Sequence, residues 1–255
     1  MNHPTADGLR VERRDAGLWL VLDRPQRRNA LTLDLVGALI EALYEPPDDV
    51  RAVVLTGTGS AFCSGGDRAD LVAIAAQGPI AVTDVVYARF QGLVRAIAAA
   101  EVPVIAAVNG PALGAGFDLS LACDLRVAAE EATFESAWVK LGLVPGLGGA
   151  HMLTRIAGAT RAAELVLLGR PLTAREALEW GLVNAVVPAD DLAGHVAAMV
   201  ATLASRSRPA LARSKAALRR ARDAGLAEEF ATLGAVQSSL AAGLDLARWG
   251  KVKPD

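Results

Sequence analysis

Two glycine-rich segments of the sequence each connect a strand-like run to a helix-like run. They are VVLTGTGSAFCSGGDRADL at 53–71 and VNGPALGAGFDLSLACD at 108–124. The N-terminus of a helix exposes backbone N–H groups without intrahelical partners and carries partial positive charge. Two such ends facing one point would bind an oxyanion, the charge that forms on a thioester or amide carbonyl during acyl or enolate chemistry. The alternative is that each segment merely turns the chain; neither contains a P-loop or a clean G-x-G-x-x-G dinucleotide motif.

The composition is that of a globular protein with a sizeable core. The chain has 255 residues, of which 53% are hydrophobic and 21% charged, and its formal net charge is −2. Basic residues are scattered, which leaves no footprint for nucleic acid or for a membrane surface. No apolar run reaches the roughly 18 residues of a spanning helix, and the N-terminal segment lacks the build of a signal peptide. We therefore expect a cytoplasmic protein without nucleic-acid or membrane partners.

Cysteine and histidine are too scarce to suggest disulfide or metal chemistry. Cys63 and Cys123 are the only cysteines, and their spacing fits no zinc motif. The histidines are His3, His151 and His195, so a metal site built on several imidazoles is not expected. We predict neither a metal nor a tightly bound cofactor.

Strand-like and helix-like segments alternate along most of the chain. The predicted strands are two in 9–23 with a turn at Asp15–Gly17, and one each at 51–56, 103–108, 124–129 and 183–188. The predicted helices include one capped by Thr32 that runs to about Tyr44, one broken at Gly78–Pro79 that runs to about Ala100, and one opened by the Thr173–Glu176 capping box and closed by Gly181. This alternation predicts an α/β fold with a largely buried sheet.

The C-terminal part is predicted to be helical throughout. From Asp190 onward the sequence is rich in alanine and contains no strand candidate. We expect an α/β core at 1–200 and a helical region at 201–255.

Taken together, these segments resemble the enoyl-CoA hydratase/isomerase (crotonase) family. The family's features occur in order as RPQRRNAL (24–31), AFCSGGD (61–67), PVIAAVNGPALGAG (103–116), ACDLRVA (122–128), LGLVPGLGG (141–149) and LTAREALEWGLVNAVVP (172–188). The resemblance covers nearly the whole chain. It implies a crotonase-like spiral of ββα units, a C-terminal helical trimerisation region, and an acyl-CoA thioester as substrate, with coenzyme A as part of that substrate.

The resemblance assigns the oxyanion hole to two backbone amides. The family's two donors correspond to Gly66 and Ala115 in this sequence. Ala115 departs from the more usual glycine, but only its N–H is needed. The methyl group should therefore be tolerated unless the loop requires a positive φ at that residue.

The same resemblance indicates where coenzyme A would lie. The RPQRRNAL segment and the stretch Ser64–Leu71 look like the walls that hold it. Arg24, Arg28 and Arg68 are candidates for contacts with its phosphates or adenine, and a solvated surface arginine is the alternative for each. The predicted substrate-binding residues also include Ser64, Asp67 and Leu71.

Asp118 is the one recognisable acid or base. The family's hydratases hold a water between two carboxylates, and Asp118 takes the place of the first, one methylene shorter than the usual glutamate. Its position near a predicted helix N-terminus favours the anion, which suits a base. The alternative is an ordinary first-turn aspartate that stabilises its own helix.

The place of the second carboxylate is taken by Trp138. A tryptophan cannot accept a proton. The nearest acid, Glu135, would point to the opposite face of a strand, so it is not expected to substitute unless the chain turns between the two residues. Trp138 is expected either to wall the acyl pocket or to pack in the core. An Ala–Trp pair here is also similar to 4-chlorobenzoyl-CoA dehalogenase, but the nucleophilic aspartate of that enzyme would fall at Gly146. Dehalogenation by that route is excluded.

We therefore expect an enzyme that stabilises a thioester enolate, and a single base favours double-bond isomerisation over hydration. Hydration with displaced acids stays open, as does an acyl-CoA-binding protein that has lost the chemistry. A serine hydrolase built on Ser64 is disfavoured because no G-x-S-x-G motif surrounds it and neither His151 nor His195 lies in a partner motif.

The resemblance also implies a homotrimer or a dimer of trimers. The C-terminal helices would form the contacts between subunits. Lys251 and Lys253 are candidates for contacts with coenzyme A phosphates, with solvated tail lysines as the favoured interpretation.

Overall fold

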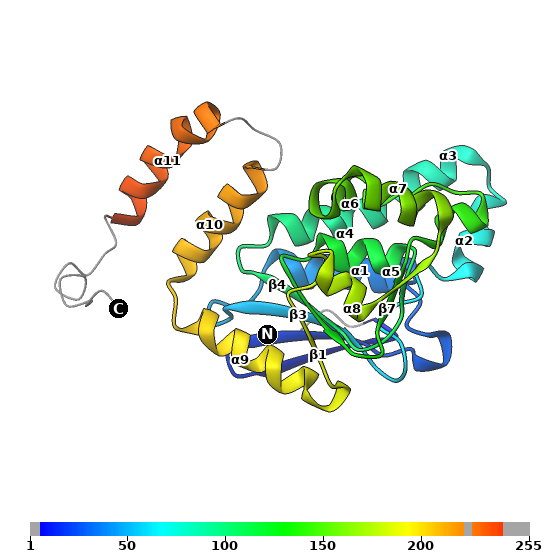
Figure 1. Ribbon diagram of the computed structural model, residues 1–255, viewed down its shortest axis with the longest axis horizontal. Helices are drawn as coiled ribbons and strands as arrows, with labels where there is room; N and C mark the ends of the chain where they lie inside the picture. The colour runs from blue at the N-terminus through cyan, green and yellow to red at the C-terminus, as the bar shows by residue number, and fades with distance from the viewer. Residues whose placement is uncertain (1–5, 222–225, 242–255) are drawn as a thin grey trace.

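The computed structural model describes residues 6–221 and 226–241. His3, Lys251 and Lys253 lie outside the described residues. Helices cover both faces of a central sheet, and the last helices extend from one end of this body (Figure 1).

The central sheet has six strands in the order β1-β2-β3-β4-β6-β9. Their bounds are β1 Leu9–Arg14, β2 Gly17–Leu22, β3 Ala52–Gly57, β4 Val104–Val108, β6 Leu125–Ala129 and β9 Ala185–Val187. Only β1 and β2 pair antiparallel; every other neighbouring pair is parallel. All residues of β2 and β4 are buried, as expected for a parallel sheet covered on both faces. The predicted strands are confirmed.

Helices pack on both faces of this sheet. On one face lie α1 (Leu33–Tyr44), α4 (Ala88–Ala99) and α5 (Ala115–Ala122), and on the other lies α9 (Leu192–Ala204) (Figure 1). The predicted cap of α1 is confirmed, since Thr32 Oγ1 accepts a hydrogen bond from Leu35 N at 3.1 Å. The apolar side chains divide into two clusters, a large one beneath α1, α4 and α5 and a smaller one beneath α9.

The helical stretch between the glycine-rich segments is broken where the sequence predicts. It consists of α2 (Arg68–Ala75), α3 (Pro79–Ala81), the π-helix η2 (Val82–Tyr87) and α4. Gly78, with φ of 105°, makes the break. Further helices are η1 Pro25–Arg27, α6 Gly149–Ala157, α7 Ala159–Leu168, α8 Ala174–Glu179 and η4 Ala189–Asp191.

A second, small sheet was not predicted. It contains β5 (Ala112–Leu113), β7 (Thr133–Glu135) and β8 (Pro171–Thr173) in the order β5-β7-β8. Strands of two or three residues are too short to show a period in sequence. Because β5 leads into α5 and β7 pairs with β5, this sheet holds the start of α5 beside the chain that continues from β7.

Glu135 and Trp138 do not lie on one strand, because the chain makes the turn between them that the sequence left open. The strand ends at Glu135, the chain turns at Ser136 (φ −79°, ψ 72°), and Trp138 lies in the 3₁₀-helix η3 (Ala137–Leu141). The alternation of faces along a strand therefore does not apply. Glu135 forms an ion pair with Lys140 at 2.9 Å instead.

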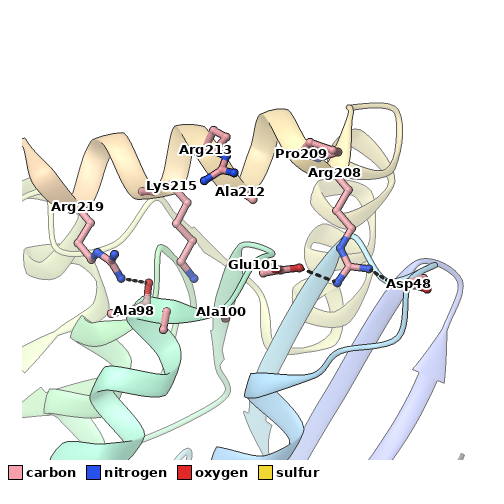
Figure 2. Close-up of a pocket in the computed structure, with 12 residues that line it drawn as sticks. Asp48, Ala98, Ala100, Glu101, Arg208, Pro209, Ala212, Arg213, Lys215 and Arg219 are labelled. Carbon is pink, nitrogen blue, oxygen red and sulfur yellow. Dashed lines mark hydrogen bonds and ion pairs between the residues drawn. The ribbon is translucent and has the colours of Figure 1, made fainter. Parts of the chain in front are cut away.

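A buried lysine docks helix α10 (Arg208–Arg220) onto the body. Lys215 Nζ donates to the carbonyls of Ile97 at 2.7 Å and Val102 at 3.2 Å and lies 2.8 Å from Asp124 Oδ2. A charge buried to this extent, 7% exposed, needs such partners. The carbonyls at the C-terminal end of α4 also favour a nearby cation. A cleft of about 470 Å³ lies between α10 and this end of α4 (Figure 2).

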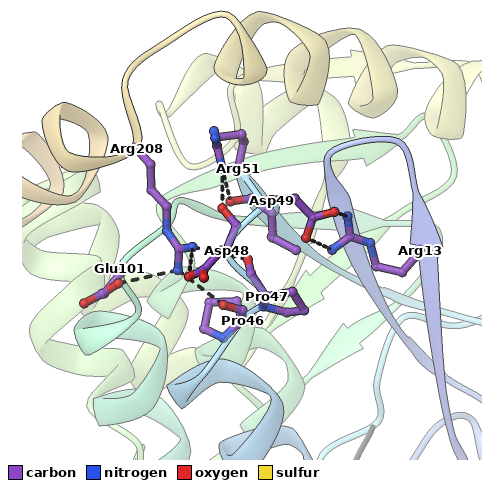
Figure 3. Close-up of polar contacts among 9 residues, drawn as sticks. Arg13, Pro46, Pro47, Asp48, Asp49, Arg51, Glu101 and Arg208 are labelled. Atoms are coloured by element: carbon purple, nitrogen blue, oxygen red, sulfur yellow. Dashed lines mark hydrogen bonds and ion pairs between the residues drawn. The ribbon is translucent and has the colours of Figure 1, made fainter. Parts of the chain in front are cut away.

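At the other end of α10, Arg208 contacts the loop after α1. Its guanidinium donates to the carbonyls of Pro46 and Pro47 and lies 3.3 Å from Asp48 and 3.5 Å from Glu101 (Figure 3). The last described helix is α11 (Leu226–Ala241). In the described ranges, we find no helix whose length and hydrophobicity would let it cross a membrane.

Candidate active site

The two glycine-rich segments lie side by side. Cys63 and Ala112 form a parallel bridge, in which Leu113 N donates to Cys63 O at 2.9 Å. The backbones approach so closely that a Cβ at Gly116 would overlap the Cys63 carbonyl. Glycine at 116 is therefore required by this contact, and the segments around Gly66 and Ala115 meet as the sequence suggested.

The amide of Gly66 points away from its neighbouring strand segment. Leu31 N donates to Gly65 O, and Asp67 N donates to Leu31 O, both at 2.8 Å. In a parallel bridge of this kind the flanking residues make the hydrogen bonds, so the N–H of the residue between them faces the opposite side. Leu71 packs over Gly66, since a Cβ at Gly66 would lie 2.9 Å from Leu71 Cδ1.

The amide of Ala115 belongs to the first residue of α5. Such an N–H has no intrahelical acceptor. The positive φ of this turn, 52°, falls on Gly114, and Ala115 is not among the non-glycine residues with positive φ. The methyl group of Ala115 is therefore compatible with the loop.

The amide of Ala115 lies close to the backbone of the Gly65–Gly66 turn. A Cβ built on Gly65 would lie 3.5 Å from Ala115 N. Over residues 6–221 and 226–241, neither Gly66 N nor Ala115 N donates a backbone hydrogen bond. Both amides therefore keep their hydrogen-bonding capacity for a ligand.

Asp118 lies one turn into α5 and is fully buried. Burial raises the pKa of its carboxyl from 3.8 to about 7. The indole N–H of Trp138 and the backbone N–H groups of Leu147 and Gly149 face it and act in the opposite direction, lowering the pKa. None of these donors combines the distance and angle of a good hydrogen bond, so both carboxyl oxygens lack a partner within the described chain. A base with a pKa near 7 is suited to proton transfer at neutral pH.

Helix α6 begins directly against this carboxyl. Gly149 is its first residue, and a Cβ there would overlap Asp118 Oδ1. Gly149 lies in the LGLVPGLGG segment, but its role against Asp118 is not predicted from the sequence. Nothing local in the sequence announces a contact between residues on two different helices.

Replacing Gly149 by alanine is expected to destabilise the protein by about 1–3 kcal/mol, the usual cost of overpacking. The added methyl group must displace the Asp118 carboxyl, so activity should fall as well. Urea denaturation measures the first effect. Gly92→Ala in α4 is the matched control, because its Cβ would meet only Ile40 Cδ1 at 3.4 Å and alanine favours the helix. Equal stability of the two variants would contradict the assigned contact.

Trp138 is half-buried and packs against the large core cluster. Its ring carbon Cε2, which is bonded to Nε1, would lie 4.0 Å from a Cβ at Gly114. The indole edge therefore lies against the start of α5, and Trp138 Nε1 is buried without a hydrogen-bond partner in the described chain.

Arg24 and Asp67 pair with each other across the site's outer edge. Arg24 Nη1 lies 2.9 Å from Asp67 Oδ2 and also donates to Ala30 O at 2.6 Å, and both side chains are largely buried. Asp67 also caps α2, since its side chain accepts from Ala69 N. Burial raises the pKa of Asp67, but the Arg24 guanidinium and the N–H groups of Ala69 and Asp70 outweigh it and lower the pKa overall. The pair fixes the glycine-rich segment to the 24–31 segment.

The other predicted coenzyme A contacts lie at the surface beside this pair. Arg28 and Arg68 are exposed, and Ser64 and Leu71 are half-buried. Ser64 N donates to Arg28 O at 2.9 Å, and the Ser64 hydroxyl donates to Arg27 O at 3.3 Å. His151 and His195 are both exposed on other helices, which gives the serine hydrolase alternative no support.

Asn29 connects the 24–31 segment to the first glycine-rich segment by hydrogen bonds, and this role was not recognised from the sequence. It is fully buried with φ of 56°, and its amide group accepts from Arg24 N and donates to the carbonyls of Thr58 and Ala61. Asparagine is one of the few residues that adopt a positive φ readily. An asparagine in this polar, proline-containing loop was the signal that the sequence offered.

The cysteines are buried and free. Burial raises the pKa of both Cys63 and Cys123 to about 12, so neither is a nucleophile at neutral pH. Within the part of the chain that the structure describes, no three histidine, cysteine, aspartate or glutamate side chains gather as a metal site would require.

Gly146 lies against an aromatic ring. A Cβ at this position would overlap Tyr87 Cε1, and Gly146 O accepts from Gln91 Nε2 at 3.1 Å. The position has no room for a longer side chain beside Tyr87.

Comparisons with known proteins show which family the chain resembles. The model of the enoyl-CoA hydratase/isomerase family matches residues 13–246. A protein of Mycobacterium tuberculosis named probable enoyl-CoA hydratase is 37% identical over 88% of this chain and 86% of its own length. The 1,2-epoxyphenylacetyl-CoA isomerase of Escherichia coli is 42% identical over 69% of this chain and 68% of its own.

The fold leads to the same family. The crystal structure of an enoyl-CoA hydratase from Polaromonas sp. JS666 superimposes with a TM-score of 0.88 at 33% identity, over 97% of this chain and 98% of the other. The fold is thus the crotonase fold that the resemblance implied. The chain belongs to the enoyl-CoA hydratase/isomerase family.

Proposed function

We propose that the protein isomerises the double bond of an enoyl-CoA thioester through an enolate held by the backbone amides of Gly66 and Ala115. The observation that carries this proposal is the carboxyl of Asp118, the one buried carboxyl among the described residues, with a pKa of about 7 and one turn behind the Ala115 amide. The family supports an acyl-CoA substrate, and coenzyme A enters as part of it rather than as a resident cofactor.

The reaction needs one base and one anion site. Ionised Asp118 removes a proton from C2 of a 3-enoyl-CoA, and the electron pair moves through the C1–C2 bond onto the thioester oxygen. The amides of Gly66 and Ala115 stabilise the resulting oxyanion. Protonated Asp118 then delivers the proton to C4, the double bond moves to C2–C3, and the carbonyl is restored.

Hydration is the less favoured reaction of the same site. Addition of water to a 2-enoyl-CoA requires that a water be held and a proton delivered by separate groups, and Trp138 stands where a second carboxylate would act. An indole can donate a hydrogen bond but cannot accept a proton. Isomerisation does not require a second acid–base group, because one carboxyl both removes the proton and returns it.

The test follows two substrates in parallel. Conversion of 3-hexenoyl-CoA to 2-hexenoyl-CoA and hydration of 2-hexenoyl-CoA are measured with the same preparation, and binding is measured by calorimetry. We expect isomerisation with the higher kcat/KM. Faster hydration would overturn the assignment in favour of a hydratase. Tight binding without turnover of either substrate would favour an acyl-CoA-binding protein.

The coenzyme A portion is proposed to lie along the outer edge of the site. Arg28 and Arg68 are exposed there and available to phosphates, whereas Arg24 is engaged by Asp67. A homotrimer or dimer of trimers is proposed as the assembly.

A further inference from the structure

Asp118 and Trp138 account for most of the buried polar atoms that lack partners. Among the described residues, four buried side-chain nitrogen or oxygen atoms have no hydrogen bond: both Asp118 oxygens, Trp138 Nε1 and Ser136 Oγ. Leaving a buried polar group unpaired is costly, so each case calls for an explanation. A carboxylate only accepts and an indole N–H only donates. The two groups are chemically complementary.

The backbone holds these two side chains in a fixed relation. Gly114 N donates to Glu135 O at 2.9 Å, and β5 pairs with β7, so the start of α5 is tied to the segment that leads into η3. Asp118 N donates to Gly114 O at 3.0 Å. The N–H edge of the Trp138 ring lies beside that same Gly114. The indole donor and the carboxyl acceptor therefore meet at the first turn of α5.

We propose that Trp138 is a positioning residue that presents its indole N–H to the Asp118 carboxylate and stabilises the ionised form of that base. Its use in catalysis rests on the proposed function, whereas the contact itself does not. At the position of the second carboxylate, a hydrogen-bond acceptor is thus replaced by the indole N–H of Trp138, which is a donor. This exchange suits a reaction with one base.

The Trp138 indole is one of a few groups that stabilise the ionised form of Asp118. The groups that lower the Asp118 pKa against burial are the Trp138 indole and the amides of Leu147 and Gly149, and no charged side chain of the described chain contributes. The titratable side chains on the adjoining α4, α6 and η3 are all exposed: Arg89, Arg95, His151, Arg155 and Lys140. Of the three donors, only the indole can be removed by changing a side chain.

The test measures the Asp118 pKa directly in the full-length, substrate-free protein. Carboxyl ¹³C resonances of aspartate are titrated, and the Asp118 signal is identified by its loss in Asp118→Asn. In Trp138→Phe the pKa should rise above that of the natural chain by at least about half a pH unit, because a donor to the anion is lost. The acid limb of kcat/KM should move to higher pH by the same amount. An unchanged pKa would overturn the proposal.

The matched control is Trp180→Phe, since Trp180 is also half-buried against the large core cluster. It should leave the Asp118 pKa unaltered, and a shift as large as that in Trp138→Phe would count against a specific contact. The natural chain gives a further readout that needs no folded variant of Trp138. Its indole ¹⁵N–¹H resonance should titrate together with Asp118, and a resonance that stays constant through that pH range would overturn the proposal. If Asp118→Asn keeps full activity, the proposed function fails while these titrations still decide the contact.

Discussion

Asp118→Asn is expected to lower kcat/KM for 3-enoyl-CoA isomerisation by about 10²–10⁴-fold, the usual contribution of a general base. Asparagine preserves the shape of the side chain but cannot take a proton. In the natural chain, kcat/KM should fall as the pH drops below about 7, because protonation removes the base. The variant should lose this acid limb. Steady-state kinetics from pH 5 to 9 measure both effects.

The same substitution is expected to stabilise the protein at high pH. The folded-state pKa of Asp118 is about 7 against an ordinary value of 3.8, so between these values the folded chain keeps a proton that the unfolded chain loses. Stability contributed by this group is complete below about pH 4 and is lost as the pH rises to 7. A gap of about three pH units corresponds to roughly 4 kcal/mol. Asp118→Asn should therefore gain up to about 4 kcal/mol at pH 8 relative to the natural chain, and little at pH 4.

Asp34→Asn is the control for both measurements. Asp34 lies in the first turn of α1 and is exposed, so it is a first-turn acid like Asp118 but without its burial. It should change neither kcat/KM nor the pH dependence of unfolding. If Asp118→Asn behaved like Asp34→Asn in the kinetics, Asp118 would be a structural first-turn residue and not the base.

Ala115→Pro is expected to reduce kcat by about 10²–10³-fold, the cost of losing one oxyanion donor. Ala115 is the first residue of α5, where proline is well tolerated because no intrahelical bond is lost. The preceding Gly114 has ψ of −116°, outside the helical region that a following proline disfavours. The substitution therefore removes the N–H while α5 remains intact, which circular dichroism can verify.

Ala115→Gly is the matched control for this variant. It keeps the N–H and restores the residue more usual in the family, so most of the activity should remain. Both variants should bind a saturated acyl-CoA with similar affinity by calorimetry if the amide acts mainly on the developing charge. Full activity of Ala115→Pro would refute the assigned donor.

Local signals in the sequence were sufficient for the large elements. The Thr32 cap, the Gly78–Pro79 break and the Thr173–Glu176 box each mark a helix end in the structure. Strands β2 and β4 of the central sheet are continuous apolar runs with clear ends. The meeting of the Gly66 and Ala115 segments followed from the family resemblance and not from any local period.

The contacts that complete the candidate site could not be predicted because they join residues far apart in the sequence. The Arg24–Asp67 ion pair spans 43 positions, and the contact between Gly149 and Asp118 joins two helices. Burial of Asp118, which raises its pKa, depends on α6 closing over it. The turn after Glu135, which changed the interpretation of Trp138, follows a strand of only three residues.

The contact between Gly146 and Tyr87 limits how this chain could acquire a different chemistry. A 4-chlorobenzoyl-CoA dehalogenase needs a nucleophilic aspartate at the position of Gly146, yet any β-carbon there collides with the phenol ring. Gly146→Asp alone would be accommodated only by displacing that ring from the end of η2. An aspartate at position 146 therefore requires that the Tyr87 ring move or that residue 87 be replaced by a smaller one.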